Sequence, residues 1–126
     1  MGVEFRIDEQ NRAILIIASG AVSAEDLRYI RTRTVELLNE TGIQNYLVDM
    51  VAVISVFEQD TTAAYNLGKN FSELDFPLST KTAVILPENE EACQQAKFLH
   101  TVEVNRMRGP LKYVTSYAEA LDWFNT

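Results

Sequence analysis

Cysteine and histidine are almost missing from this chain of 126 residues, which contains one of each, Cys93 and His100. A single cysteine permits no internal disulfide, which agrees with a reducing compartment. Both residues lie in one expected helix, where a separation of seven positions corresponds to ~10 Å along the axis. That is too far for a nucleophile and a base to share a hydrogen bond, and too far for both side chains to bind one zinc ion. We therefore expect no Cys–His enzyme within one chain and no metal site.

Glycine and proline are also scarce, with five and three residues. The glycines are isolated from one another, whereas loops that hold phosphate need closely spaced glycines after a strand. The sequence therefore predicts no nucleotide motif and no cofactor. Because no segment is biased enough to be a linker and the length suits one core, we expect a single domain over residues 1–126.

Long apolar runs and positive charge are lacking as well. The longest apolar run, Ala13–Ala18, is far shorter than the ~20 residues that cross a bilayer, and the first residues contain no signal-like segment. We expect no membrane insertion and a cytoplasmic location. With 11 Lys and Arg against 18 Asp and Glu, the net charge of −7 argues against nucleic acid as a partner. Arg28, Arg31 and Arg33 are expected on a solvated helix face.

Apolar patterning predicts the strands. Residues 3–7 alternate apolar and charged side chains and precede a polar turn, so an N-terminal hairpin is expected. The next apolar run is expected to be a central strand that Ser19 and Gly20 end or bulge. The remaining strands are expected at Tyr46–Ile54, Thr82–Leu86 and Leu111–Thr115.

Capping residues predict four helices. Serine, aspartate and asparagine side chains accept hydrogen bonds from the first free amides of a helix, and an acidic residue three positions later completes a capping box. The first helix is expected over about Ala24–Glu40, closed by Gly42, and the second ends before Pro77. The candidate caps are Ser23, then Ser55 or alternatively Asp60, then Asn89 and Ser116.

The expected order of elements is therefore β-β-α-β-α-β-α-β-α. Strands that are joined through helices of this length run parallel. The sequence predicts an α/β fold with a mixed, mostly parallel sheet of about five strands, four helices and an antiparallel N-terminal hairpin.

The chain resembles the STAS domain in this order of elements, in the strand Tyr46–Met50 ahead of a capped helix, and in the ending Val114–Phe124. More narrowly, it is similar to bacterial STAS-like proteins related to sporulation anti-sigma-factor antagonists, a group also linked by fold to lipid-binding SEC14-type domains. The resemblance extends over nearly the whole chain and rests on order and pattern. It implies a STAS-like fold and a protein partner.

The resemblance also implies candidate switch residues. In the antagonist family a serine or threonine at the start of the second helix is phosphorylated, within an Asp-Ser-Ser-Gly-like turn, and this switches binding to a kinase partner. Matching that turn by letters selects Asp60, Thr61 and Thr62, followed by Ala63 in place of glycine. Matching without gaps from the preceding strand places Ser55 at the aspartate. Helix capping explains the same residues without any phosphate.

Asp49 interrupts an otherwise apolar strand. An aspartate near the carboxyl end of a strand satisfies loop amides, and that end is also where open α/β sheets place their ligands. Among the aromatic residues, Phe57, Tyr65 and Phe98 are candidates for an apolar pocket or a partner interface, and core packing accounts for them equally well.

Three hypotheses for function follow. The leading one is a non-enzymatic regulatory or protein-interaction module of the STAS-like class, with a protein partner or self-association. The second is a protein that binds a small apolar, lipid-like ligand between the sheet and the second and third helices. The third is an enzyme, which would require carboxylates such as Asp49 and Asp60 to meet in a pocket.

Overall fold

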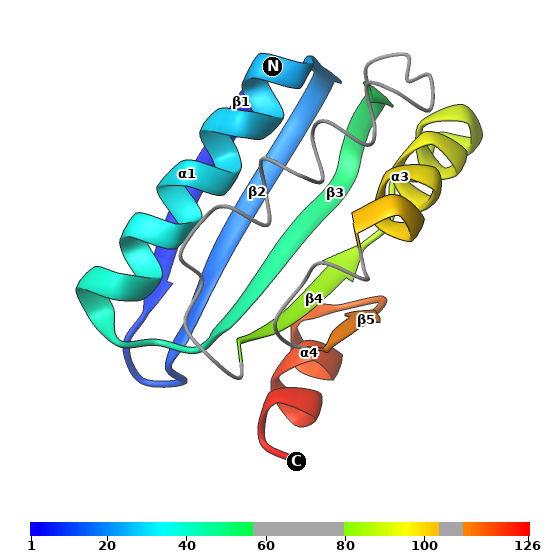
Figure 1. Cartoon of the computed structure of the whole chain (residues 1–126). Helices are drawn as coiled ribbons and strands as arrows, with labels where there is room; N and C mark the ends of the chain where they lie inside the picture. The colour runs from blue at the N-terminus through cyan, green and yellow to red at the C-terminus, as the bar shows by residue number, and fades with distance from the viewer. Residues whose placement is uncertain (57–79, 104–109) are drawn as a thin grey trace.

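The computed structural model describes residues 1–56, 80–103 and 110–126, with side chains as far as His100 in the middle range. Over these residues the five strands lie in chain order in one sheet, β1-β2-β3-β4-β5 (Figure 1). The strands are β1 (Gly2–Asp8), β2 (Ala13–Val22), β3 (Asn45–Val56), β4 (Lys81–Ile85) and β5 (Leu111–Tyr113). The helices are α1 (Ala24–Thr41), α3 (Glu90–Glu103) and α4 (Tyr117–Phe124).

The strand pairing confirms the predicted mixed sheet. β1 and β2 form an antiparallel hairpin, and β2–β3, β3–β4 and β4–β5 are parallel pairs. The hairpin turn is closed by Asp8, whose carboxylate accepts hydrogen bonds from the backbone and the side-chain amide of Asn11 at 3.0 and 2.8 Å. The helix predicted before Pro77 lies outside the described residues.

The two central strands are longer than the apolar runs that predicted them. β2 continues past Ser19 and Gly20 to Val22, with register shifts against β3 on both sides of these residues. The expectation of a bulge is therefore confirmed. Because this continuation pairs with β3, Ser55 lies inside β3 opposite Ala21. The prediction that a helix starts at Ser55 was wrong, and the alternative start at Asp60 lies outside the described residues.

The described helices begin at their predicted caps. The Ser23 hydroxyl accepts the Asp26 amide at 3.1 Å and the Asp26 carboxylate accepts the Ser23 amide at 2.9 Å, so the capping box of α1 is complete. Gly42 closes this helix in the left-handed conformation, with φ of 72°. The Asn89 side chain accepts the Ala92 amide at the start of α3.

The fourth capping site differs from a complete box. The Ser116 hydroxyl accepts the Glu119 amide at 3.1 Å, but the Glu119 carboxylate accepts from the amide and hydroxyl of Thr115, at 2.9 and 2.7 Å. These hydrogen bonds lower the pKa of Glu119. The Glu119 carboxylate thus holds the loop ahead of α4 through Thr115, the residue before the Ser116 cap.

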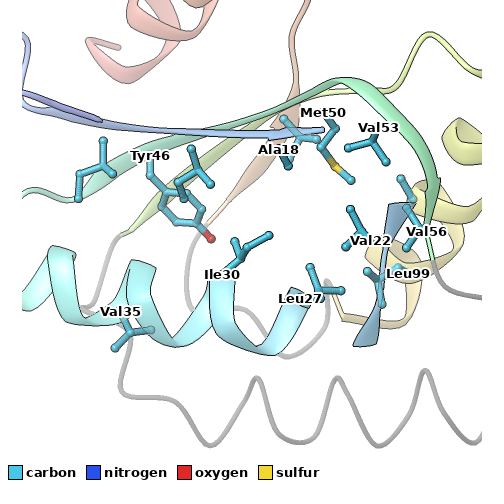
Figure 2. Packing of buried hydrophobic residues seen from close by; sticks show 14 of the residues in the cluster. Ala18, Val22, Leu27, Ile30, Val35, Tyr46, Met50, Val53, Val56 and Leu99 are labelled. Atoms are coloured by element: carbon cyan, nitrogen blue, oxygen red, sulfur yellow. The ribbon is translucent and has the colours of Figure 1, made fainter. Parts of the chain in front are cut away.

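Buried side chains form two clusters on opposite faces of the sheet, because successive residues of a strand point to opposite faces. Tyr46 of β3 belongs to the larger cluster, which includes residues of α1 and α3 (Figure 2). Leu47, the next residue, belongs to the smaller cluster, in which Ala120 and Phe124 of α4 cover the other face. The sheet is therefore the middle layer of the molecule.

Candidate functional site

A cavity lies between the sheet, α1 and α3, on the face of the larger cluster. Its volume is about 60 Å³. Figure 2 shows several of its walls, with Ile30 and Leu27 on α1 facing Met50 and Ala18 of the sheet and the Leu99 side chain of α3 nearby.

Most of the described wall of this cavity is apolar. Every strand except β1 contributes to it, as do α1 and α3. The apolar residues are Ala18, Val22, Leu27, Ile30, Val48, Met50, Val56, Val84, Leu99 and Leu111. Pockets of this composition bind ligands through their apolar body and use a few polar groups to fix orientation.

Arg31 is the charged residue of the α1 wall and is 8% exposed. The prediction of a solvated face for Arg31 was therefore wrong, although Arg28 on the same helix is exposed. The spacing explains the difference, because Leu27, Arg31, Thr34 and Leu38 recur three and four residues apart along the buried side of α1. Arg31 also takes part in an interaction within the chain.

His100 of α3 is the second basic residue in the wall and is half-buried. Burial, and then the nearby charge of Arg31, lower the pKa of His100 from 6.5 to about 4. The imidazole is therefore neutral near pH 7. Its Nδ1 lies 3.2 Å from the hydroxyl of Tyr113 on β5.

Tyr113 is the hydrogen-bond partner of this imidazole. Burial, and then the proximity of Cys93, raise the pKa of Tyr113, so its hydroxyl stays protonated at neutral pH. A protonated hydroxyl donates to Nδ1 when the ring proton lies on Nε2, and accepts from Nδ1 when the proton lies there. Cys93 itself is half-buried.

Three further polar residues line the cavity: Thr34, Tyr46 and Thr82. The Thr34 hydroxyl donates to the Ile30 carbonyl at 2.7 Å, as threonines inside helices commonly do. Figure 2 shows the Tyr46 side chain extending from the sheet toward α1, with its hydroxyl in the space between them. No aspartate or glutamate is found among the described residues of the wall.

The end of β3 is held by α3. The Gln95 side-chain carbonyl accepts the Val56 amide at 2.8 Å. Ser55 is half-buried and precedes this contact. The hydrogen bond ties Val56, the last described residue of β3, to α3.

Of the other predicted site residues that the structure describes, neither Asp49 nor Phe98 lines the cavity. Asp49 lies on β3 beside Leu47 by alternation, toward the α4 face, and its carboxylate accepts the Val51 amide at 3.0 Å. Phe98 lies on α3 and is 42% exposed. Phe57, Asp60, Thr61, Thr62 and Tyr65 lie outside the described residues, so no meeting of Asp49 with Asp60 can be described.

Within the described residues, no three His, Cys, Asp or Glu side chains are arranged to hold a metal ion. None of the helices formed by residues 1–56, 80–103 and 110–126 is long and apolar enough to cross a membrane.

The architecture is similar to the solved structure of the anti-sigma factor antagonist SpoIIAA in its unphosphorylated form. The two chains match with a TM-score of 0.60 over 98% of each chain, at 10% sequence identity. The chain has the SpoIIAA-like fold. The predicted STAS-like resemblance is thereby confirmed at the level of fold.

Two other structures share the SpoIIAA-like fold with this chain. An uncharacterized protein of the DUF3478 family from Shewanella loihica matches with a TM-score of 0.55 at 17% identity, over 97% of this chain and 91% of the other. A candidate anti-sigma factor antagonist from Thermotoga maritima matches with a TM-score of 0.58 at 14% identity, over 98% and 95% of the two chains. No family model and no curated protein matches the sequence. At such identities the SpoIIAA-like fold is shared, and function has to be argued from the residues.

Proposed function

We propose that this chain is a non-enzymatic regulatory module of the STAS-like class that binds a protein partner in the bacterial cytoplasm. The supporting observation is the fold likeness to SpoIIAA and to the Thermotoga protein, each over 98% of this chain. The acidic composition, with a net charge of −7, suits a protein partner better than a nucleic acid.

The end of β3 is the proposed centre of the partner interface. The Gln95 side chain accepts the Val56 amide and so ties the last described residue of β3 to α3. Asp60, Thr61 and Thr62 follow within a few residues. A phosphate on either threonine would add a charge of about −2 beside this point, which is enough to weaken a complex through repulsion or desolvation.

The test is a binding measurement with a purified partner. A partner is first captured on the tagged full chain from the source bacterium, and the purified pair is then studied by calorimetry. We expect the double substitution Thr61→Glu/Thr62→Glu to raise the dissociation constant at least tenfold, because it places charge at the proposed interface.

Gln44→Glu is the matched control, because Gln44 is exposed and lies at the opposite end of β3. It adds the same sign of charge away from the proposed interface and should leave the affinity unchanged. An equal loss of partner affinity in both variants, or no loss of affinity in the double threonine variant, would contradict the proposed position of the interface. If no partner is captured and the chain does not self-associate at micromolar concentration, the proposal that it is an interaction module is wrong.

A second candidate function is the binding of a small apolar ligand. The observation that favours it is the apolar cavity between the sheet, α1 and α3. It requires that a neutral apolar molecule of fitting size bind the purified chain. Titration with benzyl alcohol measures this directly.

A further inference from the structure

We propose that the free edge of β1 is a self-association surface, through which two copies of this chain pair antiparallel about a twofold axis at Phe5. The inference goes beyond the proposed function, because it concerns a different strand and a second copy of the chain in place of another protein. The two sheets, each of five strands among the described residues, then form one continuous sheet.

β1 is an edge strand. Within the described residues it lies at one end of the strand order and pairs with β2 alone (Figure 1). An edge strand presents backbone N–H and C=O groups that a further strand can bind, and proteins commonly protect it with proline, lysine or a bulge. The seven residues of β1 include no proline and no lysine, and their pairing with β2 is continuous along the strand. The edge is therefore regular enough to pair with another strand.

The sequence of β1 is complementary to itself. Phe5 is the middle residue of Gly2–Asp8, so an antiparallel register centred on Phe5 pairs all seven residues. In this register Glu4 of each copy lies opposite Arg6 of the other, and Val3 lies opposite Ile7. Opposite charges at directly paired positions stabilise an antiparallel pair, and like charges destabilise it. The charges of the strand therefore favour a second copy of itself.

The neighbouring registers of the same pairing are unfavourable. A shift by one residue places charged side chains opposite apolar ones, because apolar and charged residues alternate over residues 3–7. A shift by two residues centres the pair on Glu4 or on Arg6, so that a charge lies opposite the same charge. A strand that pairs with itself in one register produces a closed, twofold dimer.

Apolar side chains beside β1 extend the surface. Val3, Phe5 and Ile7 point to the same face of the sheet, on which α1 packs. The Tyr29 ring of α1 contacts the Phe5 ring edge-to-face, with 6.1 Å between the centroids. Tyr29 is 54% exposed and Ile7 is 42% exposed. The twofold axis at Phe5 brings the same side chains of the second copy alongside, so pairing shields this apolar surface from water.

The size and charge of the interface set its strength. Seven paired residues per copy are fewer than the ~20 residues per side of a standard interface. Each copy also has a net charge of −7, which opposes association. We therefore expect a weak dimer, with a dissociation constant on the order of 10 to 100 μM.

The experiment is sedimentation velocity of the full chain, from micromolar to several hundred micromolar concentration. We expect the chain to change from monomer to dimer over this range. Arg6→Glu and Glu4→Arg each place like charges at both paired positions, so each variant alone should dimerise at least tenfold more weakly. Both side chains are exposed, so neither substitution disturbs the core.

A mixture of the two variants tests the register. In a dimer of one Arg6→Glu chain and one Glu4→Arg chain, glutamate lies opposite arginine at both positions, so the equimolar mixture should regain the affinity of the native chain. Lys112→Glu is the matched control, because it makes the same change in net charge as Arg6→Glu at an exposed residue of β5, at the other end of the strand order. It should leave dimerisation unchanged.

Three results would overturn the inference: a chain that stays monomeric at several hundred micromolar, a mixture that dimerises no better than its components, or equal weakening by Lys112→Glu and Arg6→Glu. The last result would assign the effect to net charge. None of them decides whether another protein binds at the end of β3, because a monomeric chain can still be bound by a captured partner. The proposed function is therefore tested separately.

Discussion

His100 is the titrating group of the cavity, and its environment makes stability depend on pH. The folded state holds its pKa at about 4, against 6.5 in a solvated chain. Between these values the unfolded chain binds a proton that the folded chain does not. Stability from the neutral imidazole is therefore present above pH 6.5 and is lost as the pH falls toward 4.

We predict that the free energy of unfolding falls by about 1 to 2 kcal/mol between pH 7 and pH 5, and that His100→Gln removes this decrease. Asp8, Asp26 and Glu119 contribute little in this range, because hydrogen bonds lower their pKa values from ordinary values of 3.8, 3.8 and 4.5, and their effect on stability therefore lies mainly below pH 5. Urea unfolding at both pH values measures the difference. If the free energy of unfolding of the variant falls by the same amount between the two pH values, His100 is not the cause.

Among the elements, the starts of the helices show how far local side-chain hydrogen bonds determine where a helix begins. Ser23 and Asp26 satisfy each other's amides at the start of α1. Ser55 is followed by an acidic residue at the same spacing, Glu58, yet it lies in β3 because β2 pairs with it. A capping pattern is therefore necessary at the start of such a helix but is not sufficient, because a residue that pairs with a neighbouring strand cannot also begin a helix.

We predict that Ser23→Ala lowers the free energy of unfolding by about 1 kcal/mol, because the Asp26 amide loses its acceptor. Ser55→Ala is the matched control. Since Ser55 caps no helix, the control should cost less than about 0.5 kcal/mol. Chemical denaturation of both variants gives the comparison, and equal costs would show that the capping bond contributes nothing measurable.

For the whole molecule, the unequal layers on the two faces of the sheet determine how it opens. Among the described residues, the cluster with α1 and α3 holds eighteen buried side chains and the cluster with α4 holds six. β5, beside α4, has three residues. Less apolar burial gives a smaller free energy of local opening.

We predict that amides of β2 and the first half of β3 exchange with solvent only through global unfolding, whereas amides of α4 and β5 exchange through a smaller opening. Native-state hydrogen exchange at low denaturant measures both. Phe124→Ala should increase exchange in α4 more than in β2, because Phe124 is buried in the smaller cluster. Identical opening energies in α4 and β2 would contradict the prediction.

Much of this architecture was predictable from patterns along the chain. Alternation identified β1, apolar runs identified the core of β2, β3 and β4, and caps identified the starts of α1, α3 and α4. An apolar pocket against the sheet and the third helix was expected, but its wall residues were not predictable, because those that the structure describes come from six elements that meet only in the fold. Arg31 was predictable in part: its spacing from Leu27 and Leu38 places it on the buried stripe, but its charge suggested a solvated position.

α3 connects two of the regions to which function is assigned. Gln95 holds the end of β3, and Leu99, one helical turn further along, is part of the cavity wall. A guest that shifts this helix also changes the geometry at Val56. By thermodynamic reciprocity, a partner that binds more tightly when the cavity is filled must increase the affinity of the cavity by the same factor. The helix α3 alone is thus sufficient to couple the binding of a ligand in the cavity to the affinity for a partner at the surface.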